Sequence, residues 1–181
     1  MNQRAALAAL LRERSLTFGD FVLASGQQSS YYIDARKTTM SAEGQAMIGP
    51  LGLEVIRAAG WEPDAVGGLT MGADPIAYAV ARASVDRPPL VQAFSVRKEA
   101  KEHGTRRQIE GNFFPSAKVV VIEDVITSGG SALRAIEAVR GAGGSVLGLL
   151  TLVDRSQGGR ESIEASGIQV VAITTTADLG V

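Results

Sequence analysis

Residues 119–131 read VVVIEDVITSGGS, an apolar run that ends in two adjacent carboxylates, Glu123 and Asp124. The loop at 125–131 then supplies hydroxyl side chains and two glycines, and a helical pattern begins at its end. Backbone N–H groups in such a loop, with the positive end of the helix dipole, form an anion site suited to phosphate. Carboxylates repel phosphate, so we expect them to contact vicinal hydroxyls of the ligand or a Mg²⁺ ion. The pattern therefore predicts a ribose 5-phosphate site.

The order of these features separates the loop from other phosphate-binding motifs. It lacks the Gly-Lys-Ser/Thr of a Walker loop and the glycine spacing of a dinucleotide fingerprint. A glycine-rich turn that only joins strand to helix is the alternative for the loop alone. The whole stretch resembles the phosphoribosyl diphosphate (PRPP) motif of phosphoribosyltransferases. This resemblance implies a catalytic Asp124 and PRPP binding by Glu123, Asp124, Val125, Ile126, Thr127, Ser128, Gly129, Gly130 and Ser131.

A second cluster of charges lies in SVRKEAKEHGTRRQIEG, residues 95–111, which holds the one histidine of the chain. Most such charge runs are solvated surface loops. Cations at the diphosphate of PRPP would instead stabilise the charge that grows as the C1–O bond breaks, and would help to exclude water. The order Arg-Lys-x-x-Lys-x-His-Gly resembles the catalytic loop of the orotate phosphoribosyltransferase family, which reaches the neighbouring subunit of a homodimer. The resemblance implies that Arg97, Lys98, Lys101 and His103 bind PRPP or diphosphate, with Lys101 and His103 catalytic.

Residues for the base are indicated at two further places. Arg155, in TLVDRSQGG at the end of an apolar run, has the planar guanidinium that matches a carboxylate at two points, although a surface pair with Asp154 is the alternative. The family resemblance implies that Arg155 and Thr127 contact orotate. SGQQSSYYID resembles the hairpin of the family that lies over the base. Either Tyr31 or Tyr32 is then expected to form a wall of the base site, unless both only pack the hairpin.

Two positions depart from the family pattern. Ala24 and Met71 stand where many members carry lysine, in the hairpin and in the segment 67–73 that resembles the diphosphate-binding loop. We assign neither residue a diphosphate role. More of the diphosphate charge is then left to Mg²⁺ and the basic loop. Mg²⁺ is expected to arrive mainly through PRPP, and we assign no metal ligand with it.

An alternation of apolar strands and helices must position these side chains. Strands are expected at 65–69, 90–94, 118–123, 145–153 and 168–174, with helices at 42–59, from 74, at 131–140 and at 160–165. This predicts an α/β fold with a mostly parallel sheet flanked by helices, as in type I phosphoribosyltransferases, with ligands beyond the carboxyl ends of the strands. Those ends carry Gly67-Gly68, 95–97, 123–124 and 154–155. We expect one domain, 1–181, with an N-terminal helix and hairpin, 1–40, as a small hood.

Composition limits the class of protein. The chain has 181 residues, a formal net charge of −1 and no cysteine. Such a charge gives no general field for nucleic acid or an anionic membrane, and the absence of cysteine excludes disulfides and a thiol nucleophile. The longest apolar run, 146–153, is too short to span a bilayer. A cytoplasmic protein that binds neither nucleic acid nor membrane is expected.

The resemblance implies transfer of the ribose 5-phosphate of PRPP to orotate, which gives orotidine 5'-monophosphate and diphosphate in de novo pyrimidine (UMP) biosynthesis. A purine or uracil phosphoribosyltransferase would explain the acidic motif but not the basic loop or Arg155. A regulator that senses PRPP and binds nucleic acid would need a basic surface or a further domain, and the net charge of −1 speaks against it. A protein that binds PRPP without turnover is the third alternative, which Ala24 and Met71 favour.

Overall fold

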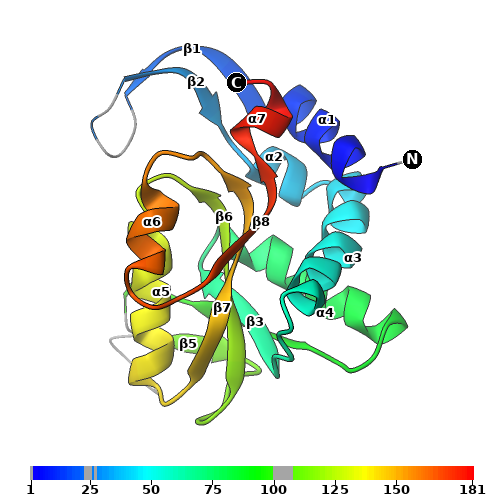
Figure 1. Cartoon of the computed structure of the whole chain (residues 1–181). Coiled ribbons are helices and arrows are strands. Elements are labelled where there is room, and N and C mark those ends of the chain that lie inside the picture. The colour runs from blue at the N-terminus through cyan, green and yellow to red at the C-terminus, as the bar shows by residue number, and fades with distance from the viewer. Residues whose placement is uncertain (1, 23–25, 27, 100–107) are drawn as a thin grey trace.

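The computed structural model describes residues 2–22, 26, 28–99 and 108–181. Within them, a six-stranded sheet has the strand order β5-β4-β3-β6-β7-β8 (Figure 1). Its strands are β3 (Ala65–Leu69), β4 (Gln92–Val96), β5 (Ile109–Gly111), β6 (Lys118–Ile126), β7 (Ser145–Asp154) and β8 (Val170–Thr175). Neighbouring strands are parallel, except that the edge strand β5 runs antiparallel to β4. The predicted α/β fold with a mostly parallel sheet is confirmed.

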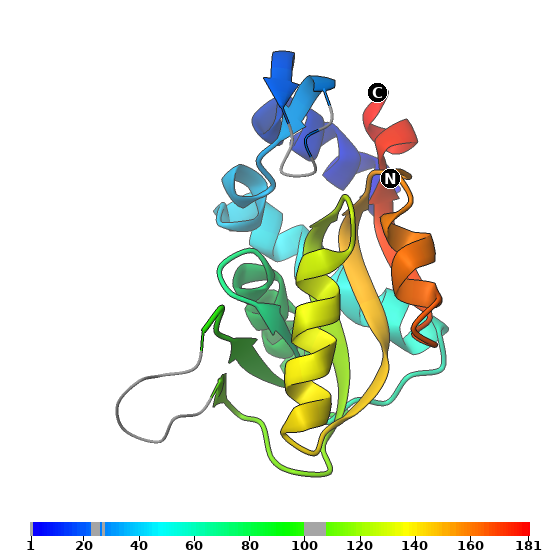
Figure 2. The same cartoon turned by 90° about the vertical axis from the view of Figure 1, so that its left-hand side faces the viewer.

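Helices cover both faces of this sheet. They are α1 (Gln3–Ser15), α2 (Arg36–Thr39), α3 (Ala42–Ala58), α4 (Ala73–Asp86), α5 (Gly130–Gly141), α6 (Gly159–Glu164) and α7 (Thr176–Leu179). Successive strand residues point to opposite faces, so Val120 and Ile122 of β6 join one core with α3 and α4, whereas Val119 and Val121 join another with α5 and α6. Figure 2 shows α5 and α3 on opposite sides of the sheet. None of the helices described is both long and apolar enough to cross a membrane.

Local chemistry explains where the predicted helices begin. The Ser41 side chain accepts a hydrogen bond from the Gly44 N–H at 3.0 Å and caps α3. Pro75 lies in the first turn of α4, where its missing N–H costs no helical hydrogen bond. Gly129, with a φ of 83°, adopts a left-handed conformation immediately before α5. The phosphate-loop glycine therefore lets the chain turn from β6 into the helix.

The N-terminal elements lie over the carboxyl end of the sheet. The strands β1 (Leu16–Val22) and β2 (Gln28–Ile33) pair antiparallel, as expected for two strands around a polar turn. Figure 1 shows this hairpin at the end of the molecule where β6 and β7 finish. The helix α1 packs against α2, α3 and α7, and the Arg12 guanidinium donates to the Leu179 carbonyl oxygen at 2.8 Å. The N-terminal helix is thus held to the C-terminal one.

Two features differ from the predictions, namely the end of β6 and the presence of three short elements. The strand β6 continues three residues beyond 123, to Ile126, because Val125 and Ile126 still pair with β7, so the acidic pair lies inside the strand. The strand predicted at 65–69 is confirmed as β3, and its Gly67 and Gly68 are buried where a Cβ would overlap backbone carbonyl oxygens of the neighbouring strands. They allow close strand packing, and the turn begins only at Thr70. The short elements β5, α2 and α7 were not predicted, since three or four residues carry no periodic signal.

Candidate active site

A cavity of about 670 Å³ lies at the carboxyl end of the sheet. The hairpin, the start of α2, the turn after β3 and the ends of β6 and β7 all contribute to its walls. The predicted site residues that line it are Lys98, Glu123, Asp124, Val125, Thr127, Ser128, Ser131 and Arg155. The fold thus brings together residues that lie more than fifty positions apart in the chain. This edge is where open parallel sheets generally hold ligands.

Burial disfavours the ionised form of both carboxyl groups of the acidic pair. It raises the pKa of Glu123 well above its usual range, and the charge of Asp124 raises it further. Burial also raises the pKa of Asp124, although the Val125 N–H, which donates to Asp124 Oδ1 at 2.9 Å, opposes that shift. A ligand that donates hydrogen bonds or carries positive charge would stabilise both carboxylates.

The phosphate loop connects this pair to α5. Thr127, Ser128 and Ser131 line the cavity. The side chain of Ile126, which is also predicted to bind PRPP, is buried in the core beneath the loop, at 1% exposure. A Cβ on Gly129 would lie 2.9 Å from the Gly159 carbonyl oxygen, so only glycine lets the loop pack this closely against α6. The hydroxyl side chains and the N-terminus of a 12-residue helix are left facing the cavity.

Arg155 is a buried cation at the end of β7. Its side chain is 4% exposed, its Nη2 donates to Ser29 Oγ at 3.2 Å, and its guanidinium carbon lies 4.5 Å from the centre of the Tyr31 ring. Asp154 does not pair with it, because that carboxylate binds Arg160, with 2.7 Å between Oδ2 and Nε. In the part of the chain described here, Arg155 Nε is buried without a hydrogen-bond partner. The arrangement therefore favours an anionic ligand.

The two tyrosines of the hairpin have different positions. Tyr32 lines the cavity, and its ring packs against Phe21 with 5.7 Å between centroids. Tyr31 lies against the Arg155 guanidinium instead. The structure thus brings Tyr32 to the cavity and Tyr31 to the arginine.

A polar network that the sequence did not reveal fixes the turn after β3. Thr70 Oγ1 donates to Asp74 Oδ2 at 2.5 Å, and Ser95 Oγ donates to Asp74 Oδ1 at 2.7 Å. The turn is thereby joined to the end of β4, from which the basic segment starts. Met71 lines the cavity and is 56% exposed. The signal available in the sequence was an acid, Asp74, directly after the segment 67–73 that resembles a diphosphate-binding loop.

The basic segment is described only in part. Lys98 lines the cavity, whereas Arg97 is exposed and its Nη1 lies 3.9 Å from Glu110 Oε1. Lys101, His103 and Ala24 lie outside the described residues. The structure therefore brings Lys98 to the site, and the roles of the other basic residues stay predictions.

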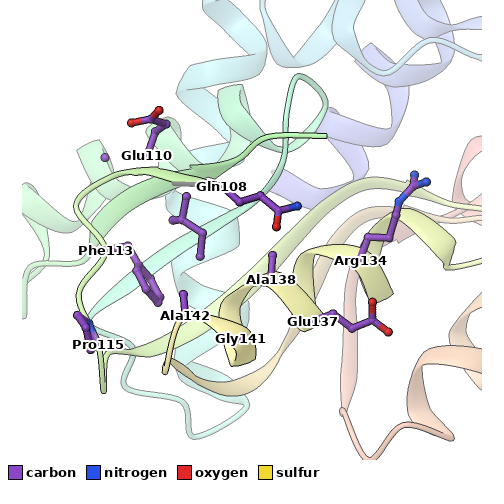
Figure 3. Close-up of a pocket in the computed structure, with 11 residues that line it drawn as sticks. Gln108, Glu110, Phe113, Pro115, Arg134, Glu137, Ala138, Gly141 and Ala142 are labelled. Carbon is purple, nitrogen blue, oxygen red and sulfur yellow. The ribbon is translucent and has the colours of Figure 1, made fainter. Parts of the chain in front are cut away.

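A larger cavity, of about 790 Å³, lies elsewhere, between β5 and α5. Figure 3 shows Arg134 and Glu137 at one end of it and Phe113 and Pro115 at the other. None of the predicted site residues lines it. Among the described side chains, the buried polar atoms without a partner are Thr39 Oγ1 and Arg155 Nε, and neither lies here. The chemistry thus selects the smaller cavity.

The fold and this site define a class of protein, and comparison agrees: the family model of the phosphoribosyl transferase domain matches residues 45–176. An orotate phosphoribosyltransferase from Aquifex aeolicus is 45% identical, over 99% of this chain and 98% of that protein. The chain belongs to the orotate phosphoribosyltransferase family.

Solved structures agree with this assignment. The structure of Mycobacterium tuberculosis orotate phosphoribosyltransferase with PRPP is 40% identical in sequence, has a TM-score of 0.83 and matches over 99% of both chains. A phosphoribosyltransferase from Corynebacterium diphtheriae is also 40% identical, with a TM-score of 0.88 over 100% of both chains.

Gly72 offers a test of the packing between the turn and the acidic pair. A Cβ at this position would lie 2.6 Å from both Cγ and Oδ2 of Asp124. We expect Gly72→Ala to displace that carboxylate, to destabilise the protein by about 1–3 kcal/mol and to weaken PRPP binding roughly tenfold. Thermal unfolding and calorimetry measure the two effects. Gly141→Ala is the control, since nothing lies within 4 Å of its Cβ, and an equal effect there would contradict the packing argument.

Proposed function

We propose that this chain transfers the ribose 5-phosphate of PRPP to orotate, which yields orotidine 5'-monophosphate and diphosphate. The observation that carries the proposal is Arg155, a buried guanidinium with no carboxylate partner among the described residues, at the wall of a cavity that also holds an acidic pair and a phosphate loop. Orotate is a planar carboxylate, and an arginine matches it at two points. The family to which the chain belongs supports the same reaction.

Each end of the two substrates has a complementary group. The loop 125–131 and the N-terminus of α5 bind the 5-phosphate, and Glu123 and Asp124 accept hydrogen bonds from the ribose hydroxyls. Arg155 binds the orotate carboxylate, with Thr127 beside it and Tyr32 as a wall. A ring nitrogen of orotate attacks C1, so no nucleophilic side chain is required. Asp124, together with Glu123, also offsets the positive charge of an oxocarbenium-like ribosyl group in the transition state.

Cations stabilise the departing diphosphate. Lys98 lines the cavity, and Arg97 lies beside it in the chain. The family resemblance assigns Lys101 and His103 to the same charge, and it includes a homodimer in which the basic loop serves the neighbouring subunit. Both assignments are part of the proposal. Sedimentation of the protein at assay concentration tests the dimer.

Mg²⁺ fits this site as a cofactor that arrives with PRPP. Among the described residues, no cluster of three or more Asp, Glu, His or Cys side chains could hold a metal by itself, and Mg²⁺ in proteins is commonly held by one or two carboxylates together with substrate phosphates. Glu123 and Asp124 are the carboxylates available to it. When bound, Mg²⁺ would offset diphosphate charge.

Chelation distinguishes such a cofactor from a structural metal. We expect EDTA to abolish turnover and added Mg²⁺ to restore it. The Tm of the ligand-free protein should not change, because the residues that the structure describes form no metal cage. A fall in Tm on chelation would show instead a resident structural ion.

The proposed reaction is tested by orotate consumption, followed by ultraviolet absorbance, with PRPP and Mg²⁺. Hypoxanthine, adenine and uracil serve as parallel bases. Turnover of orotate alone is expected, whereas turnover of another base would move the assignment to a different phosphoribosyltransferase. Binding of PRPP without turnover of any base would favour a regulator or an inactive binder. A cytoplasmic location and the absence of nucleic-acid binding stay predictions, which cell fractionation and a gel-shift assay test.

A further inference from the structure

The charges around the cavity are nearly balanced before any ligand binds. The cations that line it, within the described ranges, are Arg36, Lys98 and Arg155, and the carboxylates are Asp34, Glu123 and Asp124. PRPP adds a phosphate and a diphosphate. Arg155 is buried beside the hairpin and Lys98 lies on the exposed basic segment. Arg36 is therefore the remaining cation whose backbone belongs to a packed element.

The helix α2, which begins with Arg36, is fixed from several sides. Thr38 and Thr39 are both fully buried, and the Thr38 hydroxyl lies 2.7 Å from that of Ser15 on α1. Gln45 Nε2 of α3 donates to the carbonyl oxygens of Thr39, at 2.5 Å, and Pro75, at 2.9 Å. One amide thus joins α2 to the first turn of α4, which directly follows the turn 69–72. The backbone of Arg36 is therefore held in a fixed relation to that turn.

One nitrogen of the Arg36 guanidinium is hydrogen-bonded within the protein, and the two terminal nitrogens are available to a ligand in the described part of the molecule. Its Nε donates to Asp34 Oδ1 at 2.8 Å. In the described part of the molecule, its two terminal nitrogens have no hydrogen-bond partner, and its side chain is 47% exposed. The hydrogen bond to Asp34 raises the pKa of Arg36, and the nearby charge of Asp124 adds to this, so the group stays cationic. Two parallel N–H donors match the oxygens of a phosphate group.

The position of Arg36 relates it to the diphosphate of PRPP. The 5-phosphate is assigned to α5 and orotate to Arg155, which leaves the diphosphate for the region around the turn 69–72. Gly72 lies against the Asp124 carboxylate, and Arg36 is close enough to that carboxylate for their charges to interact. Arg36 and the turn therefore flank the same side chain.

We propose that Arg36, oriented by Asp34, is a further binding residue for the diphosphate of PRPP. The proposal rests on the function proposed above. It gives the diphosphate one cation on a packed element, Arg36, whereas the other cations assigned to the diphosphate lie on the basic segment. Asp34 acts as a positioning residue, because it occupies Nε and leaves the two terminal nitrogens directed to the ligand.

The test compares Arg36→Gln with Lys37→Gln, an equal charge change on the adjacent exposed residue, which does not line the cavity. Calorimetry with inorganic diphosphate and Mg²⁺ measures binding without turnover, and steady-state kinetics give the KM for PRPP and for orotate separately. We expect Arg36→Gln to weaken diphosphate binding and raise the KM for PRPP about 10- to 100-fold, with the KM for orotate unchanged. Lys37→Gln should change each by less than about threefold.

Arg36→Lys and Asp34→Asn refine the test, and thermal unfolding confirms that every variant is folded. Lysine keeps the charge but not the two-point contact, so an intermediate loss is expected. Asp34→Asn should also raise the KM for PRPP, since the cation remains but is no longer oriented. Equal losses in Arg36→Gln and Lys37→Gln, or a change confined to orotate, would overturn the proposal. If wild-type protein binds diphosphate through Arg36 but consumes no orotate, the reaction assignment fails and the diphosphate site stands.

Discussion

Replacing Arg155 by glutamine is expected to lower kcat/KM for orotate by about 30- to 3,000-fold, which corresponds to a loss of roughly 2–5 kcal/mol. The guanidinium is 4% exposed and has no carboxylate partner among the described residues, so the orotate carboxylate would supply its counter-charge. Glutamine retains hydrogen-bond donors but neither the charge nor the two-point geometry. Most of the effect should appear in the KM for orotate, while binding of PRPP alone changes little.

The stability of the same variant gives an independent readout. A buried cation that has no carboxylate partner among the described residues carries a desolvation cost, so Arg155→Gln should leave Tm unchanged or raise it. Arg160→Gln is the matched control, because Arg160 is the ion-pair partner of the buried Asp154, with 2.7 Å between Nε and Oδ2. That change should lower Tm, because it leaves a buried carboxylate unpaired, but should not alter the KM for orotate. Variants that lose stability and orotate affinity together at both positions would show that Arg155 is only structural.

Base preference provides a further discriminating measurement. Uracil lacks the carboxylate that Arg155 is assigned to hold, so the variant should lose activity with orotate without losing any residual activity with uracil. The ratio of the two activities is independent of how much protein is correctly folded. An unchanged ratio would place the determinant of base choice elsewhere in the cavity.

The sheet was predictable because its strands are buried on both faces and therefore form continuous apolar runs, such as 119–122 and 146–153. Their ends were less predictable. Glu123 and Asp124 are polar, and polarity alone indicated that the strand ends there, whereas pairing with β7 extends β6 to Ile126. The bounds of β3, by contrast, were predicted correctly at 65–69, and Gly67 and Gly68 lie inside that strand because the neighbouring strands approach too closely for a Cβ.

The candidate site, like the fold, could be predicted only in part from the sequence. Residues that form a contiguous motif, such as Glu123, Asp124 and the hydroxyls of the loop 125–131, could be found from local spacing. Contacts between distant segments could not, because local spacing carries no information about them. The Tyr31 ring against Arg155, and Asp74 bound to Ser95, join positions far apart in the chain. Arg36 lies two positions beyond the hairpin motif SGQQSSYYID, and only the packing of α2 relates it to the cavity.

Glu123→Gln is expected to lower kcat by about 10²- to 10³-fold and at the same time to stabilise the protein. Glutamine fits the same space but cannot offset positive charge on the ribosyl group, and so transition-state stabilisation is lost. Burial, reinforced by the charge of Asp124, raises the pKa of Glu123 well above its usual value near 4.3. At neutral pH the folded protein therefore holds a carboxyl group in a site that disfavours its ionised form, and the amide removes that cost.

The dependence of protein stability on pH shows whether the Glu123 carboxyl group stabilises or destabilises the folded state. The pKa of Glu123 is about 4.3 in the unfolded state and is raised in the folded state. Between these two pKa values the folded state binds more protons at this group than the unfolded state does. The contribution of Glu123 to stability therefore falls as pH rises through this window and is constant above it. Glu123→Gln should remove that part of the slope, so the difference in Tm from wild type should grow with pH and then level off. A gain of 1 kcal/mol moves Tm by roughly 2–4 °C at this chain length.

Glu137→Gln, an equal substitution on the exposed face of α5, is the control for the loss of one negative charge. It should change neither kcat nor the dependence of Tm on pH. If wild type and Glu123→Gln lose stability in parallel from pH 5 to pH 9, Glu123 is not buried as an uncompensated acid, and the acidic pair is already satisfied without a ligand. If the slope disappears but kcat is retained, the burial is correct and the carboxylate serves only to shape the cavity. If Glu123→Gln removes both the dependence of stability on pH and most of kcat, the Glu123 carboxylate is connected to the reaction. The positively charged ribosyl group is then the partner for which this carboxylate is kept in an unfavourable site.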